Sequence, residues 1–445
     1  MAYPLRILTS MAFLVFSLCA FSQTGAPVEP AEDEAVKVLE PIIVTGSRIK
    51  RIDIEGPAPV LVIDRQDLER AGINTLEEFA RKLPINWAPL GDTQGILAGR
   101  DIGFADFDLR GIGADSTLTL VNGRRLSPYP RYSGTAIDVN AIPVSAIERI
   151  EVLKDGASAI YGAEAIAGVV NVILRTDYDG VEVSAGYGIT EHSDNEEMLA
   201  DFVAGRDFGR GSFMFALSWL HSEMVYSRDR DWAATNDFTE QGGRRIGSPN
   251  GSPPTLLRYD TFSWEPDPSC GADPLVSWEA PVYGGTACLF NYKQYDGLIT
   301  GNERLGVTLT GRYDIKSELS LFGDLLYSDR DSENSQAAAP IANSHLIETW
   351  TGFPYVPIDH PANPFGTDGE LRSRAQDVGS RDYSVESTAW RFVAGLEGLL
   401  GNWDWLATVL LAQNDVTNTG RNEISRTRYQ QALLGMGGPN GDMYY

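Results

Sequence analysis

Apolar side chains recur at every second residue through much of the C-terminal half of the chain, and this period limits the fold more than any other feature. In residues 212–219, for example, Phe213, Phe215, Leu217 and Trp219 alternate with small or polar residues. Successive side chains of a β-strand point to opposite sides, so the alternation predicts strands with one apolar face. The candidate strands, each of a length that suits a tilted membrane strand, are Val181–Ile189, Met198–Arg206, 212–219, 304–312, 319–327, Thr388–Leu396 and Trp403–Leu411.

The connections between these strands alternate between short and long. The short ones are 207–211, 314–317 and 399–402, and the long ones are 226–302 and 330–385, with 191–197 as a brief member of the long class. Outer-membrane barrels sort their connections in this way, whereas β-sandwiches and propellers do not. We therefore expect an antiparallel transmembrane β-barrel over residues 177–445, with about seven of its N-terminal strands present.

The N-terminus has the pattern of a secretory signal peptide. Arg6 precedes an apolar run, Met11–Phe21, and small residues follow at the expected cleavage spacing. The run is too short to cross a bilayer as a helix, so we expect residues 1–22 to be removed. No later stretch is apolar for long enough to form a transmembrane helix, so if the chain spans a membrane it does so as a β-barrel.

Beyond this segment the only cysteines are Cys270 and Cys288. An exported chain meets oxidising surroundings, and the two residues are close enough in sequence to close one loop. We expect a disulfide between them. A metal site is disfavoured because no histidine accompanies the pair.

Charge and motifs argue against a nucleic-acid-binding protein and against an enzyme. The formal net charge of −25 repels phosphate backbones. The chain has no phosphate-binding P-loop motif, and its four histidines lack the spacing of metal ligands. We expect no catalytic residue, no cofactor and no metal. The acidic triplets 229–231 and 329–331 suit either calcium in loops or, more simply, solvated surface charge.

Residues 59–176 are expected to form a small α+β domain. Asp64 and Thr75 are candidate N-caps of two short helices, and Asn122-Gly123 is a strong hairpin signal. Residues 146–174 contain two apolar strands joined by a glycine-bearing turn and small residues, with no nucleophile–base pair.

This domain closely resembles the plug domain of TonB-dependent outer-membrane receptors. The Arg110-Gly111 strand, the hairpin 120–125 and the strand 148–152 occur in the order usual for that family. The resemblance implies that Arg110, Glu148, Arg149 and Glu151 face the barrel wall and dock the plug to it. The alternative is that these four are solvated surface charges.

Residues 23–58 have the composition of a linker and contain a β-branched run at about 40–46. The run resembles the TonB box of the same family. The resemblance implies that the energy-transducing protein TonB binds there by strand addition, through Glu40, Pro41, Ile42, Ile43, Val44 and Thr45. The alternative is an ordinary first strand of the following domain.

The resemblance implies active transport of a nutrient, an oligosaccharide or a siderophore-like ligand, across the bacterial outer membrane. The inner-membrane proton gradient would drive it through TonB with its ExbB/ExbD complex. The expected partners are thus TonB, outer-membrane lipid and a small organic ligand, and not nucleic acid. A passive outer-membrane porin or a surface ligand-binding protein is the alternative.

The substrate and the full extent of the barrel are not defined by the sequence. Tyr259, Trp264, Trp278, Tyr283 and Tyr292 suit stacking on a sugar or an aromatic iron chelator, but equally suit packing of the loops themselves. A plugged transporter barrel has about 22 strands, many more than the candidates found here. We therefore expect the chain to be truncated.

Overall fold

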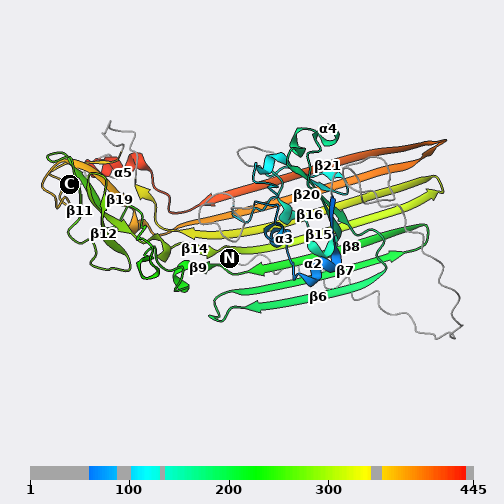
Figure 1. The fold of residues 1–445 in the computed structure, drawn as a ribbon, viewed down its shortest axis with the longest axis horizontal. Coiled ribbons are helices and arrows are strands. Elements are labelled where there is room, and N and C mark those ends of the chain that lie inside the picture. The colour runs from blue at the N-terminus through cyan, green and yellow to red at the C-terminus, as the bar shows by residue number, and fades with distance from the viewer. Residues whose placement is uncertain (1–59, 88–101, 131–135, 342–352, 437–445) are drawn as a thin grey trace. The chain divides into compact units, whose positions relative to one another are not determined.

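The computed structural model describes residues 60–87, 102–130, 136–341 and 353–436. These residues form an N-terminal mixed domain, a long antiparallel sheet and a smaller sheet built from the connections of the long one (Figure 1). The predicted order, an α+β domain followed by antiparallel barrel strands, is confirmed. No helix in these ranges is both long and apolar enough to cross a membrane.

The N-terminal domain, here called the plug, has a five-stranded sheet in the order β1-β4-β5-β2-β3. Its strands are β1 (Val60–Asp64), β2 (Thr117–Val121), β3 (Arg124–Arg125), β4 (Ile147–Leu153) and β5 (Gly168–Leu174). Its helices are α2 (Arg65–Arg70), α3 (Leu76–Lys82) and α4 (Ser158–Tyr161), with 3-10 turns η2 (Ala114–Ser116), η3 (Val139–Ala141), η4 (Val144–Ala146) and η5 (Ala163–Ala165).

Local sequence rules explain both longer plug helices. The side chain of Asp64 accepts a hydrogen bond from Asp67 N at 2.8 Å, and Thr75 Oγ1 accepts one from Glu78 N at 3.2 Å. Each cap satisfies a backbone N–H that the first helical turn leaves unpaired. The apolar faces of α2 and α3 pack with the strands in one core, which includes Leu68 and Phe79.

Seven strands form the long antiparallel sheet, here called the wall. They are β6 (Gly180–Ile189), β7 (Glu196–Asp207), β8 (Gly211–Ser222), β15 (Gly301–Lys316), β16 (Leu319–Gln336), β20 (Arg381–Leu400) and β21 (Trp403–Gly420). Each strand pairs with the next one along the chain, in the order β21-β20-β16-β15-β8-β7-β6. The seven predicted strands are therefore all present.

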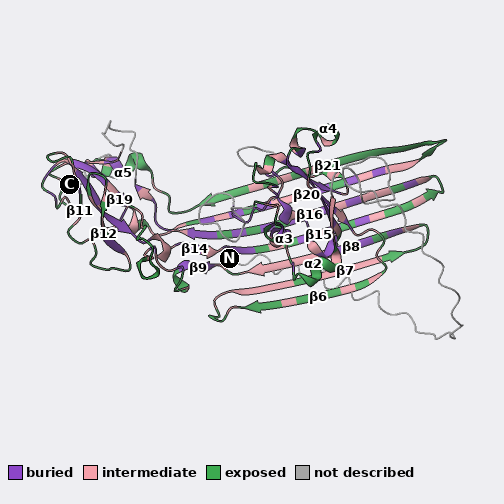
Figure 2. Cartoon of the chain, viewed as in Figure 1, coloured by how far each residue is buried: buried purple, intermediate pink, exposed green. Residues whose placement is uncertain are grey.

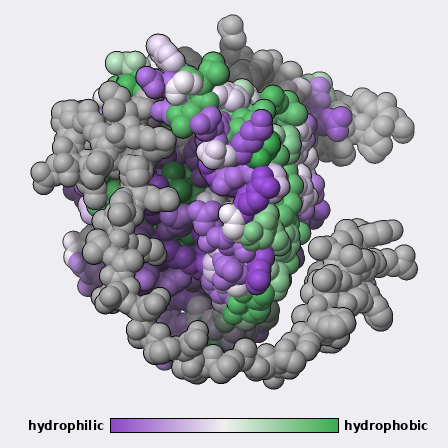
Figure 3. All heavy atoms as spheres, turned by 90° about the vertical axis from the view of Figure 1, so that its right-hand side faces the viewer, coloured by the Kyte–Doolittle hydropathy of each residue, from purple (hydrophilic) through white to green (hydrophobic). Residues whose placement is uncertain are grey.

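The two faces of the wall differ in chemistry. On β15, Leu305 and Leu309 are exposed, whereas the alternate residues Thr308 and Thr310 are buried. The same alternation of buried and exposed residues continues on β16 (Figure 2). Figure 3 shows hydrophobic residues gathered along one side of the molecule and hydrophilic residues on the side next to it. The plug covers the polar face, and the apolar face has the character of a lipid-facing surface.

The two long connections fold together into a second sheet, here called the cap. Its order is β12-β13-β11-β10-β19-β17, with β18 also paired to β19. The strands are β10 (Thr255–Arg258), β11 (Trp264–Pro266), β12 (Ser277–Val282), β13 (Gly285–Phe290), β17 (Pro340–Ile341), β18 (Tyr355–Val356) and β19 (Gly369–Arg374). A separate pair, β9 (Val225–Tyr226) and β14 (Gly297–Ile299), lies in the first connection, and 3-10 turns η6 (Ser227–Asp229), η7 (Thr239–Gln241), η8 (Tyr292–Gln294) and η9 (Gln376–Val378) complete the connections.

A third segment joins the cap from beyond the last wall strand. Helix α5 (Arg426–Leu433) places Leu433 in a cluster with Leu256, Val356 and Leu371. Gln430 donates a hydrogen bond from Nε2 to Tyr355 O at 2.9 Å. The cap core is thus built from three parts of the chain that wall strands separate in sequence.

Candidate functional site

The plug meets the wall at the hairpin of β2 and β3. Asn122 and Gly123 have φ values of 50° and 71°, the left-handed conformation that a tight two-residue hairpin turn requires. Asn122 Oδ1 accepts a hydrogen bond from Leu174 N at 3.0 Å, and Asn171 Oδ1 accepts one from Gly123 N at 2.9 Å. Because both bonds link the turn to β5, the hairpin has a defined position on the plug.

A buried ion pair of the wall holds this hairpin. Arg391 on β20 is paired with Asp324 on β16, and each side chain is only 3% exposed. Arg391 also donates from Nε to Arg125 O and from Nη2 to Val121 O, both at 3.1 Å. Burying two charges is costly unless their remaining donors and acceptors are satisfied. The plug carbonyls supply those partners, so the wall ion pair and the hairpin depend on each other.

A second cation of the hairpin lies in the same contact. The guanidinium carbon of Arg124 is 4.6 Å from the centroid of the Phe322 ring, within the range of a cation–π interaction. Burial lowers the pKa of Arg124, and the charges of Asp324 and Glu397 oppose that shift. The carboxylate of Asp324 therefore faces two guanidinium groups, one from the wall and one from the plug.

An apolar contact forms a different part of the interface. Ile142 and Ala146 of the plug belong to one core cluster with Met214 and Ala216 of β8. On β15, a methyl group at Gly306 would come within 2.5 Å of Pro143 Cγ. The wall backbone and the ring of Pro143 therefore approach as closely here as a glycine permits.

Polar contacts extend the interface in two directions. Asp138, just before η3, pairs with Arg330 of β16 at 3.3 Å, and both are buried. At the exit of the plug, Thr310 Oγ1 donates to Arg175 O at 2.6 Å and Ser212 Oγ donates to Asp177 Oδ1 at 3.0 Å.

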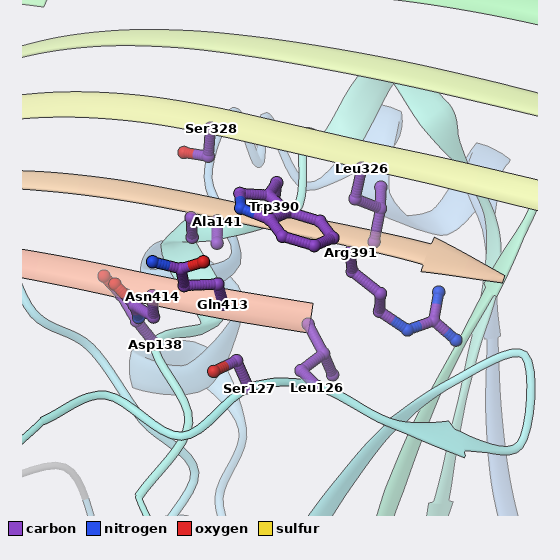
Figure 4. A pocket seen from close by; sticks show the side chains of 11 residues that line it. Leu126, Ser127, Asp138, Ala141, Leu326, Ser328, Trp390, Arg391, Gln413 and Asn414 are labelled. Carbon is purple, nitrogen blue, oxygen red and sulfur yellow. The ribbon is translucent and has the colours of Figure 1, made fainter. Parts of the chain in front are cut away.

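A crevice lies between plug and wall beside Arg391 (Figure 4). The plug contributes Leu126, Ser127, Asp138 and Ala141, and the wall contributes Leu326, Ser328, Ala389, Trp390, Arg391, Gln413 and Asn414. Leu126 directly follows β3, so the crevice begins where the chain leaves the hairpin.

The four residues predicted to dock the plug make hydrogen bonds within the plug. Arg110, in a left-handed conformation, donates to Lys154 O. Arg149 donates to Glu148 and Glu151, in each case at 2.9 Å, and Glu151 is fully buried. Their docking role therefore stays a prediction. The predicted TonB box, Glu40–Thr45, lies outside the described residues.

Four contact residues were not predicted from the sequence: Arg391, Asp324, Arg330 and Asp138. A signal was present for the three on the wall. Asp324, Arg330 and Arg391 occupy the polar alternate positions of strands whose other face carries Leu325, Tyr327 and Phe392. A full charge at such a position points into the barrel, where only an oppositely charged or polar partner can compensate it.

In the cap, Cys270 and Cys288 are joined by a disulfide. Trp264 and Trp278 are buried, and Trp264 packs against the guanidinium of Arg372 at 3.8 Å, so these two rings serve loop packing. Tyr283 is fully exposed. Tyr259 donates to Glu370 at 3.2 Å, and burial together with that carboxylate raises the pKa of Tyr259 to about 12.

Neither acidic triplet forms a cation site in the described ranges. Arg230 of the first triplet pairs with Asp194, and Arg330 of the second pairs with Asp138. Within the same ranges, no group of three or more His, Cys, Asp or Glu side chains could hold a metal ion.

Comparison with known proteins gives the family of the plug. Residues 53–169 match the family model described as TonB-dependent Receptor Plug Domain. The vitamin B12 transporter BtuB from strains of Vibrio cholerae serotype O1 is 33% identical over 177 residues, which cover 39% of this chain. The matched region is 27% of the length of that relative.

Solved structures of similar arrangement include siderophore receptors. PirA from Pseudomonas aeruginosa has a TM-score of 0.35 at 15% identity, over 82% of this chain and 51% of its own. BauA, the ferric preacinetobactin receptor from Acinetobacter baumannii, has a TM-score of 0.40 at 12% identity, over 83% of this chain and 48% of its own. The relatives are named as transporters or receptors and not as enzymes.

Proposed function

We propose that this chain, whose residues 53–169 match the TonB-dependent receptor plug domain, takes part in energised uptake of a small organic nutrient across the bacterial outer membrane. The outer-membrane location agrees with the family match. The proposed substrate class is an oligosaccharide or a siderophore-like ligand. A relative that matches over 177 residues is named as a vitamin B12 transporter, which supports an organic solute.

The observation that carries the proposal is the plug seated on the polar face of the wall. A passive porin keeps its lumen open, whereas here a folded domain binds the lumen-facing side through Arg391, Asp138 and the apolar contact around Gly306. Passage of a solute then requires work to move the plug. We propose that TonB, with its ExbB/ExbD complex, supplies that work by pairing with Glu40–Thr45 as an added strand.

Two experiments test this mechanism. Growth of a deletion strain on a panel of carbon and iron sources identifies the solute. Val44→Pro is then introduced, because proline lacks the N–H that strand pairing uses. Binding of that solute to cells should be unchanged while its uptake falls to the level of a strain without TonB.

Val36→Pro is the matched control, since it places the same change in the preceding linker. It should leave both binding and uptake intact. Normal uptake by Val44→Pro would refute strand pairing at the box, and uptake that persists without TonB would refute the energised mechanism.

A further inference from the structure

We propose that Arg372, on strand β19 of the cap, binds a carboxylate group of the solute. The inference rests on the proposed uptake function and deepens it, because it requires the solute to be an organic acid. A neutral oligosaccharide would not meet this requirement, whereas an acidic oligosaccharide or a carboxylate-bearing chelator would.

Arg372 differs from the other two arginines of the cap strands in lacking a polar partner. Arg258 on β10 forms ion pairs with Asp260 at 2.7 Å and with Glu265 at 2.8 Å. Arg374, further along β19, donates hydrogen bonds to two backbone carbonyls and a hydroxyl. Among the described residues, the guanidinium of Arg372 has no hydrogen-bond or ion-pair partner, and its Nε is buried.

The missing partner leaves a cost that a bound anion would remove. A buried N–H without an acceptor has lost its hydrogen bond to water and gained none in return. Burial lowers the pKa of Arg372, and no acidic group of the described chain offsets that shift, whereas hydrogen bonds to two carboxylates raise the pKa of Arg258. Glu370, on the same face of β19, accepts a hydrogen bond from Tyr259 instead. The acceptor that suits Arg372 must therefore come from outside the described chain.

Two aromatic rings hold the guanidinium in a fixed position. Its central carbon lies 3.8 Å from the ring centre of Trp264 and 4.9 Å from that of Phe353, both within the range of a cation–π interaction. The two rings are nearly perpendicular, with their centres 5.8 Å apart, so they form a corner around the group. Trp264 is buried, so its role is to orient the arginine. Arg372 is the only residue of β19 that is not buried, and the strand is open to solvent at this point.

The geometry of this corner favours a carboxylate over other anions. A guanidinium and a carboxylate are both planar, and they pair through two parallel hydrogen bonds. A planar partner can lie in the plane of the guanidinium without approaching the faces of the rings, which carry partial negative charge. A sulfate or phosphate places oxygens outside that plane.

An exposed aromatic side chain beside the corner suits the organic part of such a solute. The turn between β12 and β13 carries Tyr283, which is fully exposed (Figure 1). The next residue, Gly284, borders the corner, because a methyl group there would lie 3.6 Å from Trp264 Cδ1. Tyr283 is thus placed on the turn that adjoins Trp264, where its ring can stack on a ring of the bound acid.

The test compares two probes that have nearly the same shape and differ in charge. They are para-fluorobenzoate, a planar carboxylate, and para-fluorobenzamide, which is neutral. Binding of each probe to the detergent-solubilised full-length receptor is titrated by fluorine NMR. Arg372→Gln should weaken binding of the benzoate about tenfold and leave binding of the benzamide unchanged.

Arg258→Gln is the matched control, because it removes the same charge from the neighbouring strand but from an arginine that already has carboxylate partners. It should leave binding of both probes unchanged. Arg372→Lys keeps the charge and loses the planar pair of donors, so it should weaken benzoate binding less than Arg372→Gln does. It decides the test if the glutamine variant does not fold, and hydrogen exchange across β10 and β19 shows whether the cap is intact.

Two results would overturn the carboxylate site. Benzoate binding that neither variant of Arg372 weakens would mean that the guanidinium does not contact the ligand. An equal loss in Arg258→Gln would mean that benzoate responds only to the total charge of the cap. The titration requires neither TonB nor transport. A negative result would therefore leave the proposed uptake of a neutral solute standing, and the two proposals can fail separately.

Discussion

At Gly306 the absence of a side chain allows the ring of Pro143 to lie close to the wall. Gly306→Ala should push Pro143 away and weaken plug seating by about 1–3 kcal/mol, the usual cost of overpacking a close contact. The plug should then be cleaved faster by protease added to detergent-solubilised receptor.

Gly311→Ala is the control on the same strand. A methyl group there would meet its nearest atom, Ser212 O, at 3.6 Å, which is an ordinary contact. It should leave the cleavage rate unchanged. If both variants behave alike, the close approach at Gly306 does not determine the seating of the plug.

The helix caps and the hairpin turn could be predicted from neighbouring residues in the sequence. The residues that join the plug to the wall could not, because their partners are far away in the sequence. The caps Asp64 and Thr75 and the turn at Asn122-Gly123 follow from the residues beside them, and the structure confirms each. The partners of Arg391 are 266 and 270 residues away in sequence, so no local pattern names them.

Among the elements, the wall strands were predicted but their lengths were underestimated. Strand β16 has 18 residues and β20 has 20, well beyond the predicted segments 319–327 and 388–396. The missed parts carry Asp331 and Glu333 on β16 and Asp382 and Glu386 on β20, on the same side as the apolar residues. An apolar–polar alternation marks only the part of a strand that faces an apolar medium, so the extensions gave no signal.

The cap was missed for a different reason. Its central pairing joins β10 to β19, where Leu256 lies opposite Leu371. Strands this short have little pattern of their own, and the pairing partner lies beyond two complete wall strands. The sequence pattern therefore did not predict this sheet.

The disulfide is expected to stabilise the cap alone. Cys270 and Cys288 are 18 residues apart, and closing a loop of that length contributes about 3 kcal/mol. Replacing both cysteines by serine should increase hydrogen exchange across β12 and β13 and leave the plug strands unchanged. Wild-type receptor treated with reductant should behave in the same way. Unchanged exchange in the cap would show that its core alone holds the two strands.

The ion pair between Asp194 and Arg230 should make one connection sensitive to acid. Hydrogen bonds from Arg230, one of them 2.9 Å long, hold the pKa of Asp194 well below its ordinary value of 3.8. A carboxyl with a lowered folded pKa stabilises the fold above its unfolded pKa and loses that contribution as the pH falls. The protection of residues 190–195 from hydrogen exchange, measured relative to the intrinsic exchange rate at each pH, should therefore fall when the pH drops below about 4.

The variant Asp194→Asn isolates this effect from the titration of other carboxyls. It should show fast exchange in this connection already at neutral pH, with little further change on acidification. Asp229→Asn is the control, because Asp229 is 3.9 Å from Arg228 and does not bond Asp194. If the Asp194→Asn variant still loses protection in this connection on acidification, a group other than Asp194 causes the response.

For the whole molecule, the sidedness of the wall gives a test of its orientation in the membrane. Leu309 is exposed on the apolar face, and Leu309→Lys should reduce folding into lipid vesicles by about 2–4 kcal/mol if it lies near the bilayer centre. Glu333→Lys changes an exposed residue of the same face beyond the apolar rows and should be tolerated. For both variants, the folded fraction is measured as the fraction of receptor whose mobility on a gel is changed by heating. Equal tolerance would mean that this face does not meet lipid.

The three-part origin of the cap also sets the order in which the protein can mature. Segments from both long connections and from α5 must meet before the cluster of Leu256, Leu371 and Leu433 exists. The side chain of Leu256 therefore stays exposed during export until Leu433, nearly 180 residues further along the chain, has also crossed the inner membrane. Newly exported chains with exposed apolar segments aggregate unless they are shielded. Biogenesis of this receptor should accordingly depend on periplasmic chaperones until α5 arrives.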